Sequence, residues 1–175
     1  MHVSLTLLFS FLMFFSPSST AQKQKQTRLQ WAIAATLPPT KGQPHSLGFA
    51  GPVAGVHHAV VLVAGGANFP NSMPWLGGKK KYYDDVYLYT DSAGKLTLLP
   101  NILHLPAPIA YAASCSTPQG IVYAGGENES GISNQVFLIQ ISPLNRALSV
   151  QPLPHLPEGV TNATALAVEN KVYVA

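Results

Sequence analysis

Short apolar runs, each followed by a glycine pair, recur along the chain. One run spans Val60–Ala64 and continues into Gly65-Gly66, and a second spans Ile121–Ala124 and continues into Gly125-Gly126. A third, Lys171–Ala175, reaches the last residue. Short apolar runs bounded by turn residues are typical of buried strands, and self-similarity at a fixed period indicates stacked supersecondary units. The pattern therefore predicts strands in repeating units.

A Leu-Pro pair accompanies the glycine pair. It occurs at Leu37-Pro38, Leu105-Pro106 and Leu156-Pro157. From Leu105 to Gly125 is 20 residues, and the same step from Leu156 reaches 176, one beyond the last residue. We therefore expect the chain to stop inside a repeat, as the N-terminal part of a longer protein that continues with Gly-Gly.

Each repeat also contains strands before and after its glycine pair. Third strands are predicted at 85–89 and 135–139, fourth strands at 96–99 and 148–150, and innermost strands, rich in Gly, Ala and Ser, at 47–54, 109–116 and 160–168. Four strands in about fifty residues make the blade of a β-propeller. The predicted fold class is all-β, with about two and a half four-stranded antiparallel blades that resemble the Kelch type.

The repeat also sets domain boundaries. Residues 22–175 are predicted to form a partial propeller, with a first blade over 46–106, a second over 107–157 and the start of a third over 158–175. Residues 28–38 are predicted as an isolated outer strand, in which Trp31 matches the tryptophan that Kelch repeats often carry on a fourth strand. Because an incomplete ring leaves sheet edges uncovered, we expect the chain alone to be unstable or prone to aggregation.

The N-terminus reads as a targeting segment. Leu5–Phe15 is a mainly apolar stretch of 11 residues, shorter than the ~20 residues that span a bilayer. Ser19-Thr20-Ala21 then places small residues where a signal peptidase cleaves. The sequence predicts a signal peptide over 1–21, a mature start at Gln22 and export to the periplasm or the exterior, without a membrane span.

Charge and cysteine content exclude several functions. The net charge of +3 rests partly on the loop residues Lys79–Lys81, and nothing beside them resembles a nucleic-acid module, so we expect no nucleic-acid partner. Cys115 is the only cysteine, which rules out an intramolecular disulfide and favours a buried small hydrophobe over a reactive thiol. His57 and His58 have no further ligand at metal-binding spacing, so no metal site is predicted.

One loop is longer than the repeat requires. Val86 lies 20 positions after Gly66, whereas Val136 lies only ten positions after Gly126. Loops of such extra length are often functional. This one contains aromatic and donor side chains suited to a saccharide, and we take five as candidate substrate-binding residues: Asn68, Phe69, Trp75, Lys80 and Tyr82. The alternative is a lid that packs on itself without a ligand.

The long loop, together with Leu47–Gly51 and Gly125–Asn128, resembles the N-acetylneuraminate epimerase family, the sialic acid mutarotases, and especially its cyclically permuted branch. The resemblance implies a six-bladed Kelch propeller, exported and often periplasmic. It also implies an isomerase that interconverts the α and β anomers of N-acetylneuraminate without a metal or organic cofactor. Kelch innermost strands often begin with arginine after the Leu-Pro turn, and here Pro108–Tyr111 has none.

Anomer exchange requires a base for the anomeric hydroxyl proton and an acid for the ring oxygen, each worth typically about 10²–10⁴-fold. Glu127 directly follows a glycine pair, where the resembled family places its proposed acid–base residue, and it is the candidate catalytic residue; Asn128 is a further substrate-binding candidate. The alternative for Glu127 is a turn carboxylate. Asp84 and Asp85 are adjacent, which on a strand directs them to opposite faces and disfavours a shared-proton pair.

Three functions follow from these features. The first is a mutarotase of sialic acid that uses general acid–base catalysis, and this partial chain alone would then be inactive if the ring is needed. The second is a non-catalytic propeller that binds glycans or protein through the same loops. A copper oxidase on a related propeller is disfavoured because the sequence shows no ligand set. Since fold does not determine function, the first choice depends on the inserted loop.

Overall fold

The computed structural model describes residues 29–39, 42–100 and 102–175. The chain divides into two units, Met1–Ala32 and Ile33–Ala175. In the first unit the described residues, 29–32, form no helix or strand. The predicted signal peptide over 1–21 lies outside the described residues. The second unit carries all the elements that follow.

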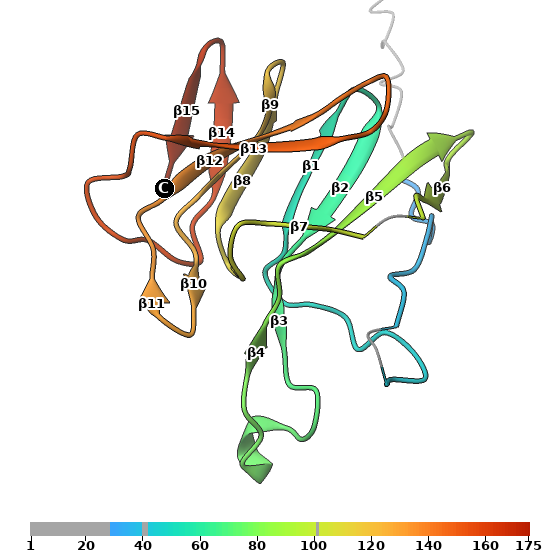
Figure 1. Cartoon of the computed structure of the whole chain (residues 1–175), viewed down its shortest axis with the longest axis vertical. Coiled ribbons are helices and arrows are strands. Elements are labelled where there is room, and N and C mark those ends of the chain that lie inside the picture. The colour runs from blue at the N-terminus through green and yellow to red at the C-terminus, as the bar shows by residue number, and fades with distance from the viewer. Residues whose placement is uncertain (1–28, 40–41, 101) are drawn as a thin grey trace, which may run out of the picture. The chain divides into compact units, whose positions relative to one another are not determined.

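The first blade is a sheet in the order β1-β2-β5-β6, with β7 paired to the start of β5 (Figure 1). Its strands are β1 Val53–His57, β2 Val60–Ala64, β5 Asp85–Ser92, β6 Lys95–Leu98 and β7 Leu103–His104. All neighbours are antiparallel, and Val53 lies opposite Ala64 in the first pair.

The second blade repeats the same order as β8-β9-β12-β13. Its strands are β8 Ala113–Thr117, β9 Gly120–Ala124, β12 Val136–Ile141 and β13 Leu148–Leu153, and a third repeat contributes the hairpin β14 Ala165–Val168 and β15 Lys171–Val174. The described residues contain no α-helix, only the short 3-10 helix η1 at Pro74–Leu76. None of the helical segments described is long and apolar enough to cross a membrane.

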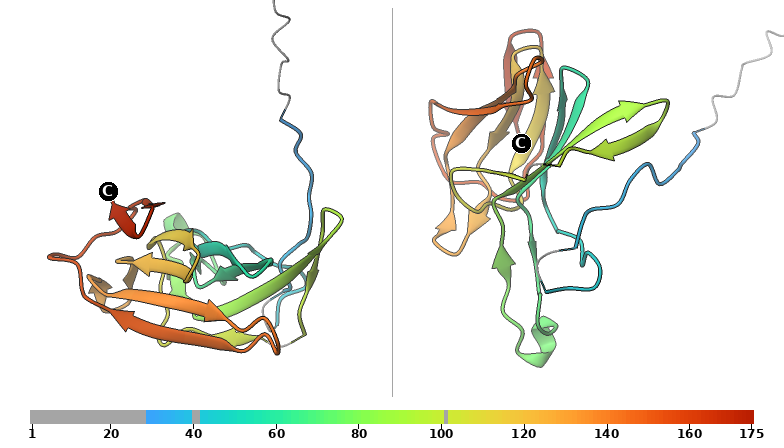
Figure 2. Two further views of the ribbon diagram at one scale, coloured as in Figure 1. Left: turned by 90° about the horizontal axis from the view of Figure 1, so that it is seen from above. Right: turned by 45° about the vertical axis from the view of Figure 1, so that its right-hand side comes forward.

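The innermost strands of successive repeats lie side by side. β8 lies between β1 and β14 (Figures 1 and 2). Across the first of these contacts, Ser114 Oγ donates to the carbonyl of Ala54 at 3.1 Å, and Val56 N donates to Ser116 Oγ at 2.8 Å. Because each blade presents its first strand to the next blade's first strand, the sheets are arranged around a common axis. This confirms the predicted class of four-stranded antiparallel propeller blades.

Hydrogen bonds also join equivalent positions just before each innermost strand. Tyr111 N donates to the Gly51 carbonyl at 2.7 Å, and Asn162 N donates to the Tyr111 carbonyl at 2.9 Å. All three residues have positive φ, between 55° and 59°. This left-handed backbone cannot belong to a strand, so the innermost strands begin at Val53, Ala113 and Ala165, four to six residues later than predicted.

The glycine pairs join each blade to the next. Gly66 N donates to the Ile109 carbonyl, and Gly126 N donates to the Val160 carbonyl, both at 2.8 Å. Gly65 and Gly125, the first of each pair, have φ of +63° and +68°. A Cβ on Gly65 would collide with the Ile109 carbonyl oxygen, and one on Gly125 with that of Val160. Only glycine combines this backbone with this close approach.

The core lies between the first two blades. Among the described residues the largest fully buried side chains belong to β1, β2, β5, β9 and β12, and they include Leu62, Leu88, Ile121 and Ile139. They alternate with residues that face the other side of each sheet, as the strand period of two requires. Val122, Ala124 and Val136 form a second cluster on the face toward the third repeat.

The prediction of an isolated outer strand over 28–38 is wrong for residues 29–38, the part that the structure describes. Residues 29–38 form no strand, and Trp31 is 90% exposed. A strand needs a neighbour to accept and donate its backbone hydrogen bonds. Two hydrogen bonds join residues 34–36 to the first blade, from Leu96 N to the Ala34 carbonyl at 3.2 Å and from Tyr89 OH to the Thr36 carbonyl at 3.4 Å.

Candidate active site

Two hairpins project from the same end of the first and second blades (Figure 1). One consists of β3 Ala67–Asn68 and β4 Lys81–Tyr82, and the other of β10 Glu127–Asn128 and β11 Gly131–Ile132. Each begins directly after a glycine pair. The backbone of Glu127 is further tied to the segment just before β8, since Glu127 N donates to the Ala110 carbonyl at 2.8 Å and Ala110 N donates to the Glu127 carbonyl at 3.0 Å.

The first and third repeats contribute hydrogen-bond donors to the Glu127 carboxylate of the second repeat. Tyr82 OH donates to Oε1 at 2.8 Å, and Lys80 Nζ donates to the same oxygen at 3.2 Å. Thr161 Oγ1, which precedes β14, donates to Oε2 at 3.3 Å. The Glu127 side chain is 22% exposed, so it remains open to solvent and to a ligand. We name these four residues, with Tyr111, the Glu127 cluster.

Lys80 lies between two aromatic rings. Its Nζ is 5.0 Å from the ring centroid of Tyr111 and 5.6 Å from that of Tyr82. Both distances are within the range for cation–π attraction. The ammonium therefore has three favourable neighbours, counting Glu127, and its position is set by all of them.

The electrostatics of the cluster favour a charged carboxylate and protonated donors. The hydrogen bond from Tyr82 lowers the pKa of Glu127 against the opposing effect of burial, and Lys80 lowers it further. Burial raises the pKa of Tyr82, and its bond to Glu127 adds to this. For Lys80, burial acts to lower the pKa, but Glu127 and the two tyrosines outweigh it and the pKa is raised. At neutral pH Glu127 is thus a base beside two proton donors.

A cavity of about 420 Å³ adjoins Lys80. Three of the predicted substrate-binding residues line it, and we call it the Lys80 cavity: Leu47, Gly48, Phe49, Ala50, Ala67, Asn68, Phe69, Met73, Lys80 and Tyr111. Asn68 is held there at both ends of its amide, because Nδ2 donates to the Gly48 carbonyl at 2.9 Å and Oδ1 accepts from Tyr83 OH at 2.8 Å.

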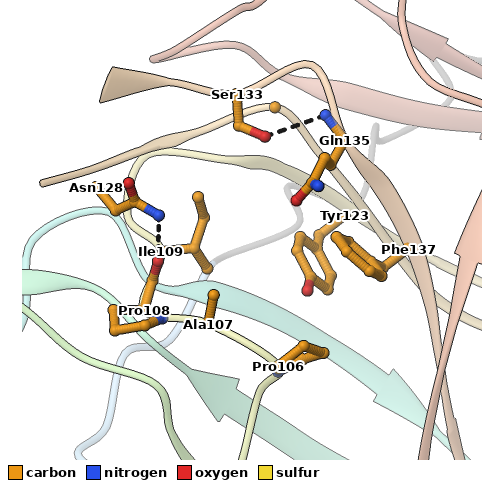
Figure 3. A pocket seen from close by; sticks show the side chains of 10 residues that line it. Pro106, Ala107, Pro108, Ile109, Tyr123, Asn128, Ser133, Gln135 and Phe137 are labelled. Atoms are coloured by element: carbon orange, nitrogen blue, oxygen red, sulfur yellow. Dashed lines mark hydrogen bonds between the residues drawn. The ribbon is translucent and has the colours of Figure 1, made fainter. Parts of the chain in front are cut away.

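Two predicted site residues lie elsewhere. Trp75 is on η1 at the tip of the long loop and is 77% exposed. Asn128 follows Glu127 on β10 and points to the other side of the strand, where its Nδ2 donates to the Pro108 carbonyl at 3.0 Å (Figure 3). There it lines a second space of about 260 Å³, the interblade cavity: Pro106, Ala107, Pro108, Ile109, Tyr123, Gly125, Asn128, Ser133, Gln135 and Phe137.

The prediction that Asp84 and Asp85 point apart is wrong. His104 Nδ1 lies 3.3 Å from Asp84 Oδ1 and 3.6 Å from Asp85 Oδ1. Only Asp85 belongs to β5, so strand alternation does not apply to the pair. Within the described chain these three residues form a group with the ligand types and spacing for a divalent cation, with one ligand atom of each within 4.8 Å of the others. His104 is exposed, and the group is separate from the Glu127 cluster.

Sequence reasoning missed Tyr111 and Thr161. Tyr111 occupies the same place before its innermost strand as Gly51 and Asn162, and Thr161 precedes Asn162. Aligning the repeats at these positions would have directed attention to the residues that approach Glu127. The signal was present in the register of the repeat, not in a motif.

Sequence comparison supports a relationship that the long loop suggested. The N-acetylneuraminate epimerase of Brucella melitensis biotype 1 is 32% identical over 146 residues, which cover 78% of this chain and 36% of that protein. The chain is related to the N-acetylneuraminate epimerases. The epimerase of Yersinia enterocolitica is 33% identical over 124 residues, covering 63% of this chain and 29% of that protein.

The chain thus spans about a third of the length of the N-acetylneuraminate epimerases that it matches. No protein-family model matches it. Among solved structures, that of YjhT is 27% identical with a TM-score of 0.49, over 66% of this chain and 33% of that one.

Proposed function

We propose that this protein accelerates the interconversion of the α and β anomers of N-acetylneuraminate by general acid–base catalysis. The observation that carries the proposal is the contact of Glu127 with Tyr82 and Lys80, which places one carboxylate base beside two proton donors. The names of its epimerase relatives supply the substrate class. The Lys80 cavity, with aromatic, amide and ammonium groups, has the donors that a carboxylated sugar requires.

In the proposed reaction Glu127 takes the proton of the anomeric hydroxyl while Tyr82 donates its proton to the ring oxygen. The bond between the anomeric carbon and the ring oxygen breaks, its electron pair goes to that oxygen, and the anomeric carbon becomes a ketone carbonyl. The proton on Glu127 then returns to the Tyr82 oxygen along the 2.8 Å hydrogen bond. The reverse steps close the ring on either face, so no proton is gained or lost overall.

Lys80 has a separate role in this proposal. An ammonium has three N–H donors, and one of them is used on Glu127. The others are free to hold the carboxylate of the sugar, in the region where the resembled family's innermost strands often begin with arginine. Asn68 and Phe69 would line the sugar ring within the same cavity.

The test is proton NMR of freshly released α-N-acetylneuraminate with the protein expressed from its complete gene. The β anomer is expected to appear faster than in buffer. Glu127→Gln is expected to lose about 10²–10⁴-fold of the acceleration while folding is kept, and Glu129→Gln, an exposed neighbour, is the matched control. Sugar binding without any acceleration would contradict the proposal and favour a non-catalytic glycan-binding propeller.

We also propose that the protein is exported, with cleavage after Ala21. The apolar stretch and the small residues that follow it support this proposal. N-terminal sequencing of the protein from the periplasmic or extracellular fraction is expected to begin at Gln22. Recovery of intact protein from the cytoplasm alone would contradict it.

A further inference from the structure

The interblade cavity is formed by two successive blades and is separate from the Glu127 cluster. Pro106, Pro108 and Ile109, on the connection from the first blade to the second, form one wall (Figure 3). Tyr123 on β9 and Phe137 on β12 form the opposite wall, with ring centroids 5.1 Å apart and an interplanar angle of 20°. All four strands of each of these two blades lie within the described residues, so this chain supplies both walls of the cavity.

The Tyr123 hydroxyl is the polar group at the base of this cavity. Tyr123 as a residue is 3% exposed, and its hydroxyl makes no hydrogen bond to a described residue. No fully buried side-chain polar atom among the described residues lacks a partner, so this hydroxyl keeps some access to the cavity that Tyr123 lines. Burial raises the pKa of Tyr123, so the phenol is protonated and available as a donor. A hydroxyl that opens from a buried side chain into a cavity can pair with water or with a ligand that displaces that water.

The rim of the cavity is polar but carries no charge. Asn128, Ser133 and Gln135 stand there, and none of the lining residues within the described chain is Asp, Glu, Lys, Arg or His. The side chains of Asn128 and Ser133 are partly used, since Asn128 donates to the Pro108 carbonyl and Ser133 Oγ accepts from Gln135 N at 3.0 Å. The Gln135 side chain is exposed at the rim. A charged ligand would therefore lose its hydration without gaining an ion pair.

The size of the cavity limits the ligand to about one ring. Pockets for drug-sized ligands have volumes of about 300–1,000 Å³, and this one has about 260 Å³. Apolar and aromatic walls with neutral amide and hydroxyl groups match the two faces of a sugar ring, which presents C–H groups on its flat sides and hydroxyls at its edge. We propose that the interblade cavity is a binding site for an uncharged pyranose, held by the Tyr123 hydroxyl and the Gln135 amide.

The site is independent of the proposed anomer exchange, and the probe is chosen accordingly. Methyl β-D-glucopyranoside is uncharged, and its anomeric centre is blocked, so it cannot be a mutarotase substrate. Titration by saturation-transfer difference NMR with the protein from its complete gene is expected to show saturable binding. Glu127→Gln is expected to bind the glycoside as the wild type does.

Tyr123→Phe isolates the decisive contact. It removes a hydroxyl that has no partner among the described residues, so the melting temperature should be retained. Loss of one hydrogen bond, worth about 0.5–1.5 kcal/mol, corresponds to binding that is weaker by about twofold to thirteenfold. Tyr173→Phe, on exposed β15, is the matched control and should bind as the wild type does.

Three results would overturn the proposal. They are no saturable binding by the wild type, equal affinity for Tyr123→Phe and the wild type, and loss of glycoside binding in Glu127→Gln, which would locate the glycoside in the other site. If Tyr123→Phe fails to fold, Gln135→Ala provides the same comparison at the exposed rim, and unchanged affinity in that variant would equally contradict the assignment.

Discussion

Replacing Gly65 by alanine tests why the glycine pairs are required. At Gly65 the backbone has φ of +63°, and the added Cβ would collide with the Ile109 carbonyl oxygen and approach the Tyr83 carbonyl oxygen to 3.2 Å. The Ile109 carbonyl cannot withdraw freely, because it accepts the hydrogen bond from Gly66 N at 2.8 Å. The substitution thus disturbs the join between the first and second blades.

The expected cost is worked from three contributions. A left-handed backbone costs a non-glycine residue about 1–2 kcal/mol. Overpacking against a fixed neighbour costs about 1–3 kcal/mol, and weakening the Gly66–Ile109 bond costs about 1 kcal/mol. Because these contributions overlap, the free energy of unfolding should fall by about 3–5 kcal/mol.

Gly94→Ala is the matched control. Gly94 has φ of +81° in the turn between β5 and β6, and a Cβ there would meet no atom within 4 Å. It should therefore cost only the backbone contribution, about 1–2 kcal/mol. The assay is urea unfolding followed by circular dichroism, with the protein from its complete gene and with unchanged m-values as the check on two-state behaviour. Equal losses in the two variants would refute the close-approach argument.

Two further predictions concern side chains away from the site. His57 is buried and its Nδ1 accepts from Ile141 N at 3.0 Å, and burial followed by the nearby His58 lowers its pKa below 6.5. Because the folded state binds this proton less readily than the unfolded state, the free energy of unfolding should fall as the pH drops below 6.5 toward the folded pKa. Thermal melts of the wild type should therefore give a lower melting temperature at pH 5 than at pH 7. A His57→Asn variant with the same pH response would contradict this prediction. Cys115 is half-buried, and burial raises the pKa of its thiol. Iodoacetamide should therefore label Cys115 more slowly in the folded protein than in the urea-unfolded chain, with labelling measured by mass spectrometry. Equal labelling rates would be inconsistent with the packing.

The second and third strands of each blade were predictable because they consist mainly of apolar residues that are buried or half-buried. Val60–Ala64 is β2 as predicted, and the predicted run Ile121–Ala124 lies within β9. The signals are local: a short apolar run marks both strands, and a glycine pair directly follows the second. The sheet order then follows from the antiparallel connection of each strand to the next.

The starts of the innermost strands were not predictable in the same way. Tyr111 and Asn162 adopt positive φ although neither is glycine, and the hydrogen bonds that hold them come from the neighbouring repeats. Local propensity favours an extended backbone at a tyrosine. The tertiary bonds override that preference, and nothing in the adjacent sequence indicates them.

The site was predictable in part for a similar reason. Glu127, Lys80 and Tyr82 were singled out because few charged residues occur and one loop is too long. Their contacts span 45 and 47 residues of sequence, so spacing alone could not show that they meet. Asn128 was grouped with them as a sequence neighbour, but strand alternation directs it to the opposite side of β10.

The measurement that bears most directly on the account is a double-mutant cycle on the rate of anomer exchange, with Tyr82→Phe and Glu127→Gln singly and together. If the two residues act as one acid–base pair, Tyr82→Phe should slow exchange at least about tenfold in the wild-type background and have little further effect beside Glu127→Gln. Strictly additive effects, or a wild type that exchanges the anomers no faster than buffer, would contradict the proposal that these blades bring the two side chains together for catalysis.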